Sequence, residues 1–345
     1  MSDPVPSQRT DHATAPVLAP TPTPAAGTVT GTPPKGTPPA AARVVAVLVH
    51  YRCADDTLGC IASIQEHAPG TPVLVVDNAA ADGSGAALAQ RCAGFAQVTV
   101  LHARTNRGFG AGCNGGIDRA VARFPELEHV LLLNPDARLR PGALQQLRNC
   151  ARNHPRAGVV GCRIVEPDGD VWFANGRFPR FSLSRFHTRP PGGATEFETG
   201  FVTGCCMLID AGMLRRGLRF DPSFFLYGED ADLCRRVQQR GRSLWVTQAA
   251  TVEHRGGGSQ PGPRVLDELS AERLYWLTRA KVLLARKHYE PWRRAVFLLV
   301  AALVKPLAAV LTGRGVRWLP AYARGLWAGL SGGPGTGQGP DRDAG

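Results

Sequence analysis

Acidic side chains at three places along the chain could take part in binding a nucleotide, binding a metal or moving a proton. Asp77 follows the apolar run VLVV and precedes Asn78, and Asp136 follows the run LLLNP. A carboxylate can accept a hydrogen bond from the imide N–H of a pyrimidine base, or it can bind a divalent cation that neutralises a diphosphate. Asp77, assisted by Asn78, therefore suits recognition of a base, and Asp136 suits a metal site.

The third place is Glu229-Asp230, which is followed by Asp232. Acids in the first turn of a helix complement its macrodipole, so these residues need no further role. Alternatively, one of the three carboxylates acts as a general base that takes the proton of an acceptor hydroxyl. Their spacing does not distinguish between them. His254, in TVEHRGGG, could add a nitrogen ligand to the metal, which makes Mn²⁺ as suitable as Mg²⁺.

The segments that carry these residues alternate between predicted strands and helices. This alternation indicates βαβ units and a mainly parallel open sheet, in which ligands bind beyond the carboxyl ends of the strands. Asp77 and Asp136 both fall at such ends. We expect loops near the substrate over the polar interval 172–199. The predicted strands are 44–49, 73–78, 98–101 and 129–133, with short apolar runs at 158–165 and 207–209, and the predicted helices are 55–67, 86–92, 115–123 and 229–240.

Composition divides the 345 residues into four parts. Residues 1–42 are rich in Pro, Thr and Ala and should be disordered, 43–264 should form the catalytic domain, 265–330 a basic helical segment, and 331–345 a disordered Gly-rich tail. The nine cysteines contain no C-x-x-C pair, which favours reduced thiols in the cytosol.

The basic helical segment suggests a membrane surface. Of the formal net charge of +12, residues 271–330 carry eleven Lys and Arg against two Glu. Helices are predicted at 269–284 and 295–311, but Lys305-Pro306 interrupts the apolar run 295–304, and a spanning helix needs about twenty residues. We therefore expect interfacial helices on an anionic leaflet, peripheral at the cytoplasmic face, with a helical cap on the catalytic domain as the alternative.

Six motifs in this order make the chain resemble the family 2 glycosyltransferases, in particular their rhamnosyltransferase-like branch. They are VVDN (75–78), NRGFGAGCNGG (106–116), LLLNPDA (131–137), GCCMLI (204–209), FFLYGEDADLCRR (224–236) and EHRGGGS (253–259). The resemblance implies the GT-A nucleotide-diphospho-sugar transferase fold, an α/β fold with helices on both sides of the sheet. It also implies an inverting mechanism.

The same resemblance assigns roles to residues. Asp136 would hold Mg²⁺ or Mn²⁺ with His254 nearby, and the base would lie in the E-D-x-D motif, with Asp230 favoured over Glu229. The donor would be a nucleotide-sugar, first dTDP-rhamnose and then a UDP-sugar. The acceptor would be a hydroxyl of a glycan or of a polyprenyl-linked glycan in cell-surface polysaccharide synthesis. The residues expected to contact the nucleotide-sugar are Tyr51, Asp77, Asn78, Asn106, Gly108, Asn114 and Asn134.

Two other readings compete with this one. Gly110 to Gly115 satisfies the pattern G-x-G-x-x-G, with Asp136 about twenty residues on, as in a Rossmann-type NAD(P) oxidoreductase. However, these glycines begin well after the strand 98–101 rather than in the turn that follows it. A non-catalytic basic protein that binds membrane or nucleic acid is the other reading. Because the positive charge gathers in one apolar segment, we expect no nucleic-acid partner. The sequence does not indicate an oligomeric state.

Overall fold

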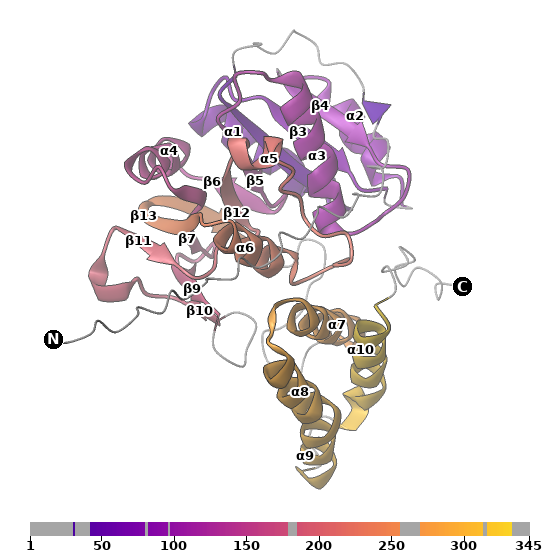
Figure 1. Ribbon diagram of the computed structural model, residues 1–345. Helices are drawn as coiled ribbons and strands as arrows, with labels where there is room; N and C mark the ends of the chain where they lie inside the picture. Colours follow the sequence, from indigo (N-terminus) through magenta and orange to yellow (C-terminus); the bar gives the residue numbers. More distant parts are fainter. Residues whose placement is uncertain are drawn as a thin grey trace, which may run out of the picture.

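A mixed β-sheet of eleven strands forms the centre of the computed structural model, which describes residues 30–31, 42–79, 82–95, 97–178, 185–255, 270–312 and 316–332. The strand order is β1-β4-β3-β2-β5-β12-β7-β13-β11; β6 also pairs with β13, and β8 with β7 (Figure 1). These strands are β1 Thr30–Gly31, β2 Val44–His50, β3 Val73–Asp77, β4 Val98–His102, β5 His129–Leu133, β6 Ala137–Leu139, β7 Ala157–Val165, β8 Val171–Phe173, β11 Glu196–Thr199, β12 Cys206–Asp210 and β13 Ser243–His254.

The first half of the sheet matches the βαβ prediction. Strands β4, β3, β2 and β5 are parallel neighbours, and all residues of β2 and β3 are buried, as expected for strands covered on both faces. The helices of this half are α1 Ala54–His67, α2 Ser84–Cys92 and α3 Phe109–Arg123. Residues 1–29 and 32–41, expected to be disordered, lie outside the described residues, as do 256–269 and 333–345. The pair Thr30–Gly31 is antiparallel to β4.

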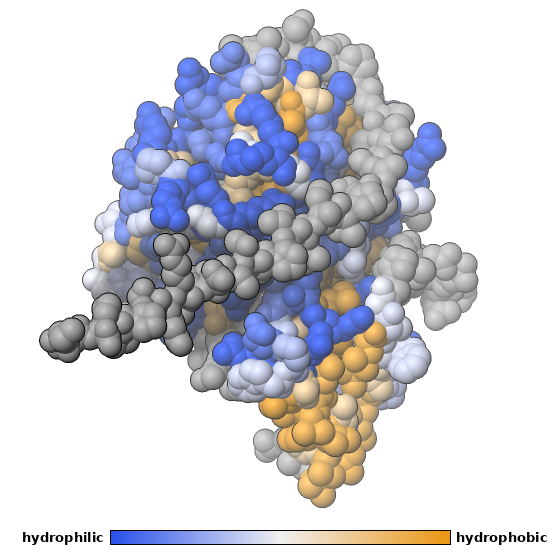
Figure 2. All heavy atoms as spheres, in the orientation of Figure 1, coloured by the Kyte–Doolittle hydropathy of each residue, from blue (hydrophilic) through white to orange (hydrophobic). Residues whose placement is uncertain are grey.

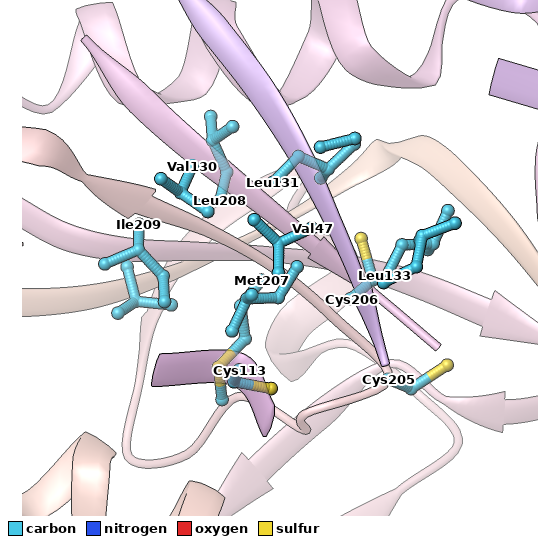
Figure 3. Packing of buried hydrophobic residues seen from close by; sticks show 14 of the residues in the cluster. Val47, Cys113, Val130, Leu131, Leu133, Cys205, Cys206, Met207, Leu208 and Ile209 are labelled. Carbon is cyan, nitrogen blue, oxygen red and sulfur yellow. The ribbon is translucent and has the colours of Figure 1, made fainter. Parts of the chain in front are cut away.

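The second half of the sheet is not parallel throughout. Strand β12 lies between β5 and β7 and runs antiparallel to both. It places Met207 and Leu208 beside Leu131 and Leu132 in the buried core, and Figure 3 shows these two strands side by side with Cys113 of α3. The antiparallel course brings the start of β12 to the end of β5. The Gly204-Cys205 turn therefore lies beside the residues that follow β5.

Helix α3 begins at Phe109, six residues before the predicted start. Glycine lowers helix propensity by about 1 kcal/mol per residue, so the glycine-rich segment did not resemble a helix. These glycines let the helix approach the sheet closely. A Cβ on Gly112 would lie 2.8 Å from Val49, and a Cβ on Gly116 would overlap Val47.

The interval 172–199 contains more regular structure than the predicted loops. Besides β8 and β11, a hairpin of β9 Asn175–Arg177 and β10 Arg185–His187 forms a separate two-stranded sheet. Two further helices, α5 Ala211–Arg215 and α6 Glu229–Gln239, come after β12, and α4 Ala143–Asn153 follows β6. The nine cysteines all lie in the described residues, where none of them forms a disulfide.

The C-terminal helices both cap the catalytic domain and project from it. Helix α7 Ala271–His288 packs on α6 and on α10 Leu319–Ser331. Between them, α8 Pro291–Leu299, a π-helical segment Val300–Val304 and α9 Lys305–Thr312 follow one another without a break. This confirms the helix predicted over 295–311, although Lys305-Pro306 interrupts its apolar run. The wider turn of the π-helical segment precedes Pro306, which lacks a backbone N–H and would crowd the preceding carbonyls of a regular α-helix.

Candidate active site

The end of β3 gathers the residues expected to recognise a base. Asp77 is buried; its Oδ2 lies 3.0 Å from Nδ1 of His102, and its Oδ1 accepts a hydrogen bond from the amide of Ala79. Asn78 donates from Nδ2 to Oδ1 of Asn106 over 3.0 Å. Oδ1 of Asn106 also accepts from the amide of Gly108 over 2.9 Å. The structure thus brings four predicted residues from two segments into one polar cluster.

Two histidines that sequence reasoning missed flank Asp77. His50 and His102 are its partners in register on β2 and β4. His50 is fully buried, its Nδ1 lies 2.8 Å from Oγ1 of Thr57, and burial lowers its pKa, so the imidazole is neutral. The signal was available, because the last residues of neighbouring parallel strands must lie side by side.

Gly108 holds the segment before α6 against α3. Its φ of 92° suits glycine, and a Cβ there would overlap the carbonyl oxygen of Phe225. The same oxygen accepts a hydrogen bond from the amide of Phe109 over 3.1 Å. Gly108 therefore fixes the segment that leads into Glu229, and so links the polar cluster around Asn106 to the start of α6.

Asn114 is occupied by backbone hydrogen bonds. Its Nδ2 donates to the carbonyl of Phe220 over 2.9 Å, and its Oδ1 accepts from the amide of the same residue over 2.8 Å. This arrangement fastens α3 to the segment before α6. Contact of Asn114 with the nucleotide-sugar stays a prediction, as it does for Tyr51 and Asn134, which are half-buried after β2 and β5.

Asp136 and His254, 118 positions apart in the sequence, meet at the end of β5. Strand β13 pairs antiparallel with β6, with His254 opposite Ala137, and this places Nε2 of His254 3.2 Å from Oδ1 of Asp136. Two ligands on adjacent corners of an octahedron with bonds of about 2.1 Å stand about 3.0 Å apart. The spacing and the largely buried side chains therefore fit a shared divalent cation.

The three acids of α6 have three different environments. Glu229 is buried against α3, and its Oε2 has no hydrogen-bond partner within the described part of the chain. Burial, reinforced by the neighbouring Asp230, raises the pKa of Glu229 to about 8. Its carboxyl group is therefore mostly protonated at neutral pH.

Asp230 is half-buried and well oriented. Its Oδ2 accepts a hydrogen bond from the amide of Gly204 over 3.1 Å, and its Oδ1 accepts from the amide of Ala231 over 2.7 Å. Burial raises the pKa of Asp230, and the two amides offset part of that rise because they stabilise the carboxylate. The result is an oriented carboxylate that binds a proton more readily than an exposed aspartate.

Asp232 is fully buried and serves the packing of α7. It contacts Nζ of Lys287 at 2.7 Å, Nε2 of His288 at 2.8 Å and Nε of Arg236 at 2.7 Å. Burial acts to raise its pKa, but these cationic and hydrogen-bonding partners outweigh it and lower the pKa to about 2. With its oxygens engaged in this way, Asp232 is a poor general base.

The turn before β12 connects the segment around Asp136 to Asp230. The amide of Gly204 bonds Asp230, and the carbonyl of the next residue, Cys205, accepts from the amide of Asn134 over 2.9 Å. Asn134 in turn accepts from the amide of Ala137, which closes a turn around Asp136. Two consecutive residues thus join carboxylates that are 94 positions apart in the sequence.

Cys150, His154 and Glu196 also place ligand-type atoms within 4.8 Å of one another. His154 already bonds Glu196 over 3.1 Å and stacks on the Trp245 ring at 3.3 Å. These contacts explain why the three side chains lie together, because they pack the end of α4 against β11 and β13.

The glycines of the G-x-G-x-x-G pattern lie inside α3, where Gly112 packs on Val49 of β2 and Gly110 packs on Phe220. Helix α3 starts seven residues after β4 ends. The tight turn that a dinucleotide fingerprint places directly after its strand is therefore not present at this position in the described structure.

Comparisons with known proteins agree with this geometry. The model of "Glycosyl transferase family 2" matches residues 45–218. An N-acetylglucosaminyl-diphospho-decaprenol L-rhamnosyltransferase of Mycobacterium tuberculosis is 28% identical over 218 residues, covering 55% of this chain and 69% of the relative. A low-salt glycan biosynthesis hexosyltransferase, Agl10, of Haloferax volcanii is 22% identical over 219 residues, covering 60% and 66%.

Solved structures show the same fold. GalNAc-T7 with UDP, GalNAc and Mn²⁺ has a TM-score of 0.54 at 14% identity, covering 69% of this chain and 47% of that one. Residues 1–349 of S. aureus TarS in complex with UDP-GlcNAc have a TM-score of 0.51 at 14% identity, covering 84% and 81%. The fold is therefore GT-A, as the sequence predicted. Because the family model covers half of the chain and includes the ends of β3 and β5, this chain belongs to glycosyl transferase family 2 and is a glycosyltransferase.

Proposed function

We propose that the enzyme transfers a sugar with inversion from a nucleoside diphosphate sugar to an acceptor hydroxyl, with Asp230 as the base. The observation that carries this proposal is the connection through Gly204 and Cys205, which holds Asp230 beside the segment of Asp136. A nucleotide-binding cluster, a metal pair and an oriented carboxylate then lie along one edge of the sheet, where α/β proteins bind ligands.

The reaction exchanges one bond of the anomeric carbon for another and transfers one proton. Asp230 accepts the proton of the acceptor hydroxyl as its oxygen attacks the anomeric carbon, and the bond from that carbon to the diphosphate oxygen breaks. Asp136 and His254 would hold Mg²⁺ or Mn²⁺, which neutralises the charge of the departing nucleoside diphosphate. Asp77, Asn78 and Asn106 orient the base of the nucleotide.

We assign the donor as dTDP-L-rhamnose first and a UDP-sugar second. The relative from Mycobacterium tuberculosis is named as an L-rhamnosyltransferase that acts on a diphospho-decaprenol acceptor, which supports a rhamnose donor and a polyprenyl-linked glycan acceptor. We place the enzyme at the cytoplasmic face of a membrane, attached from that face without crossing the bilayer and active in cell-surface polysaccharide synthesis. Reduced cysteines and the basic C-terminal helices support this location.

A donor screen that reads nucleotide release with Mg²⁺ or Mn²⁺ tests the proposal, with Asp230→Asn and Glu229→Gln as a matched pair. Loss of a positioned base costs about 10²- to 10⁴-fold in turnover, so Asp230→Asn should fall by that factor while still binding the donor. Glu229→Gln should keep most of its turnover at neutral pH, because Glu229 is already protonated there. Near-normal turnover of Asp230→Asn together with an inactive Glu229→Gln would move the base to Glu229.

A further inference from the structure

The helix Pro291–Leu311, here called the apolar arm, projects from the catalytic domain with almost no protein around it. It has 21 residues, its most apolar window of 18 residues has a mean hydropathy of 2.1, and only 6% of that window is buried. Figure 2 shows the arm as the largest apolar region of this face, below a mostly hydrophilic domain. Its large side chains are exposed along its whole length, for example Leu299 at 57%, Leu303 at 59% and Leu311 at 76%.

The arm is long enough to reach deep into a lipid bilayer, and its first residues suit the bilayer surface. At 1.5 Å per residue its apolar part, residues 295–311, is about 26 Å long, which is shorter than the roughly 30 Å of the hydrocarbon core. Trp292 and Arg293 lie at its start, with the guanidinium group over the neighbouring indole ring. Tryptophan and arginine favour the boundary between lipid and water.

The exposure is too broad for a single protein partner. Neighbouring positions such as Val300 and Leu303-Val304 are exposed together, so the apolar surface runs around much of the helix. A helix of a second copy would cover only one stripe of that surface. The arm carries Arg293 and Arg294 in its first turn and Lys305 further along, and Lys305 is exposed on a flexible stem that can extend towards the headgroups. Lipid is therefore the occupant that fits.

Helix α10 returns the chain to the catalytic domain. A Cβ on Gly325 would lie 2.6 Å from the carbonyl of Tyr275, and one on Gly329 would lie 2.6 Å from Val282, so α10 packs closely along α7. Nη1 of Arg286 donates to the carbonyls of Gly329 and Leu330 over 2.7 Å.

Helix α7 is itself fixed to the catalytic domain. Trp276 stacks on Phe225 at 4.5 Å, Arg279 donates to the carbonyl of Ser223 over 2.7 Å, and Lys287 pairs with the buried Asp232. The start of the arm and the end of α10 must therefore lie on the same side of any membrane that the arm enters.

We propose that the apolar arm inserts into the hydrocarbon of a bilayer as one limb of a re-entrant hairpin, which enters and leaves through a single face and so does not cross. This differs from helices that lie flat on the surface, because it requires apolar contact at depth. It also orients the enzyme, because α7 packs beside the segment that leads into Glu229. The site is then held near acceptors that are anchored in the same leaflet.

Site-specific labels on the full-length protein test the insertion. Cys53 is the one exposed cysteine of the nine, so in a Cys53→Ser background a single cysteine at Leu311 or at Ser331 can carry an environment-sensitive dye, while wild type labelled at Cys53 reports on the catalytic domain. With phosphatidylcholine vesicles, the label at 311 should be quenched by brominated lipid and protected from external dithionite. The labels at 331 and 53 should both be reduced by dithionite.

Each other pattern overturns part of the proposal. A label at 311 that dithionite reduces rejects insertion. A label at 331 that is protected while the one at 53 is reduced indicates a spanning helix. A label at 311 that is protected without vesicles, and more so as protein concentration rises, shows that other copies of the chain cover the arm.

A charge substitution gives an independent readout. Leu307→Glu should weaken binding to phosphatidylcholine vesicles by about 10-fold or more, because a carboxylate in hydrocarbon is costly. Gln145→Glu adds the same charge on the exposed surface of α4 and should leave binding unchanged. Both variants should release nucleotide from a soluble donor at the wild-type rate, so failure of insertion is distinguishable from failure of the proposed catalysis. Equal vesicle binding by Leu307→Glu and wild type would overturn the proposal.

Discussion

Replacing Glu229 by Gln should make the folded protein more stable at alkaline pH. In the unfolded chain this carboxyl group titrates near its ordinary pKa of 4.5, whereas in the folded protein burial and Asp230 raise its pKa to about 8. Between these values the folded state holds a proton that the unfolded state has lost. Wild type therefore loses stability as pH rises from about 4.5 to 8, and the neutral glutamine does not.

The size of the effect follows from that pKa difference. At about 1.4 kcal/mol per pKa unit, the full difference corresponds to roughly 5 kcal/mol. Because Asp230 shares the local charge, we expect about half of this, ~2 to 3 kcal/mol. For a domain of 150–250 residues that is a rise in Tm of roughly 4–12 °C at pH 9 relative to wild type.

Thermal unfolding of wild type and Glu229→Gln at pH 5 and pH 9 measures this effect. The two proteins should be close at pH 5, and the variant should be more stable at pH 9. Glu66→Gln, on the exposed surface of α1, is the matched control and should follow wild type at both values. Parallel curves for wild type and Glu229→Gln across the whole range would refute the assignment of a buried, proton-binding Glu229.

Three further substitutions test the framework of the site. Asp232→Asn removes the buried carboxylate that pairs with Arg236 and Lys287, although Lys287 keeps its pair with Asp221. The substitution should cost about 1.5–3 kcal/mol of unfolding free energy at pH 7, opposite in sign to Glu229→Gln, and unchanged denaturant midpoints would contradict this. Gly108→Ala forces a Cβ onto the carbonyl of Phe225. Turnover should fall by more than the fraction of protein that the lower Tm leaves unfolded at the assay temperature, as parallel activity and melting assays would measure. Asn114→Ala leaves the Phe220 backbone groups unpaired and should lower stability by ~1–3 kcal/mol, with no change in donor affinity if the residue acts only through packing.

Strand ends were the part of the site that the sequence predicted well. VLVVDN and LLLNPDA are buried strands followed by polar residues, and the parallel order of β3, β2 and β5 places Asp77 and Asp136 at one edge. The pairing of His254 with Asp136 depends instead on β13 lying antiparallel to β6. No local pattern encodes that pairing, although its residue type made His254 a candidate ligand.

Features that depend on tertiary packing were mispredicted or left open. Helix α3 was placed too late because its glycines reduce helix propensity, although they are what allows its approach to Val49. The choice among Glu229, Asp230 and Asp232 needed the partners supplied by Gly204 and by α7, which are distant in sequence. The apolar run 295–304 was judged too short to span because Lys305-Pro306 follows it, whereas the helix carries exposed apolar side chains on to Leu311.

Asp136 and Asp230 serve one site in different roles, metal binding and proton transfer. Calorimetric titration of dTDP and UDP, with and without Mn²⁺, into wild type, Asp136→Asn and Asp230→Asn tests this assignment most directly, with turnover measured on the same samples. We predict that Mn²⁺ strengthens nucleotide binding to wild type and to Asp230→Asn but not to Asp136→Asn, and that both variants lose turnover. A metal-dependent gain in affinity that survives in Asp136→Asn, or is lost in Asp230→Asn, would contradict this division of roles.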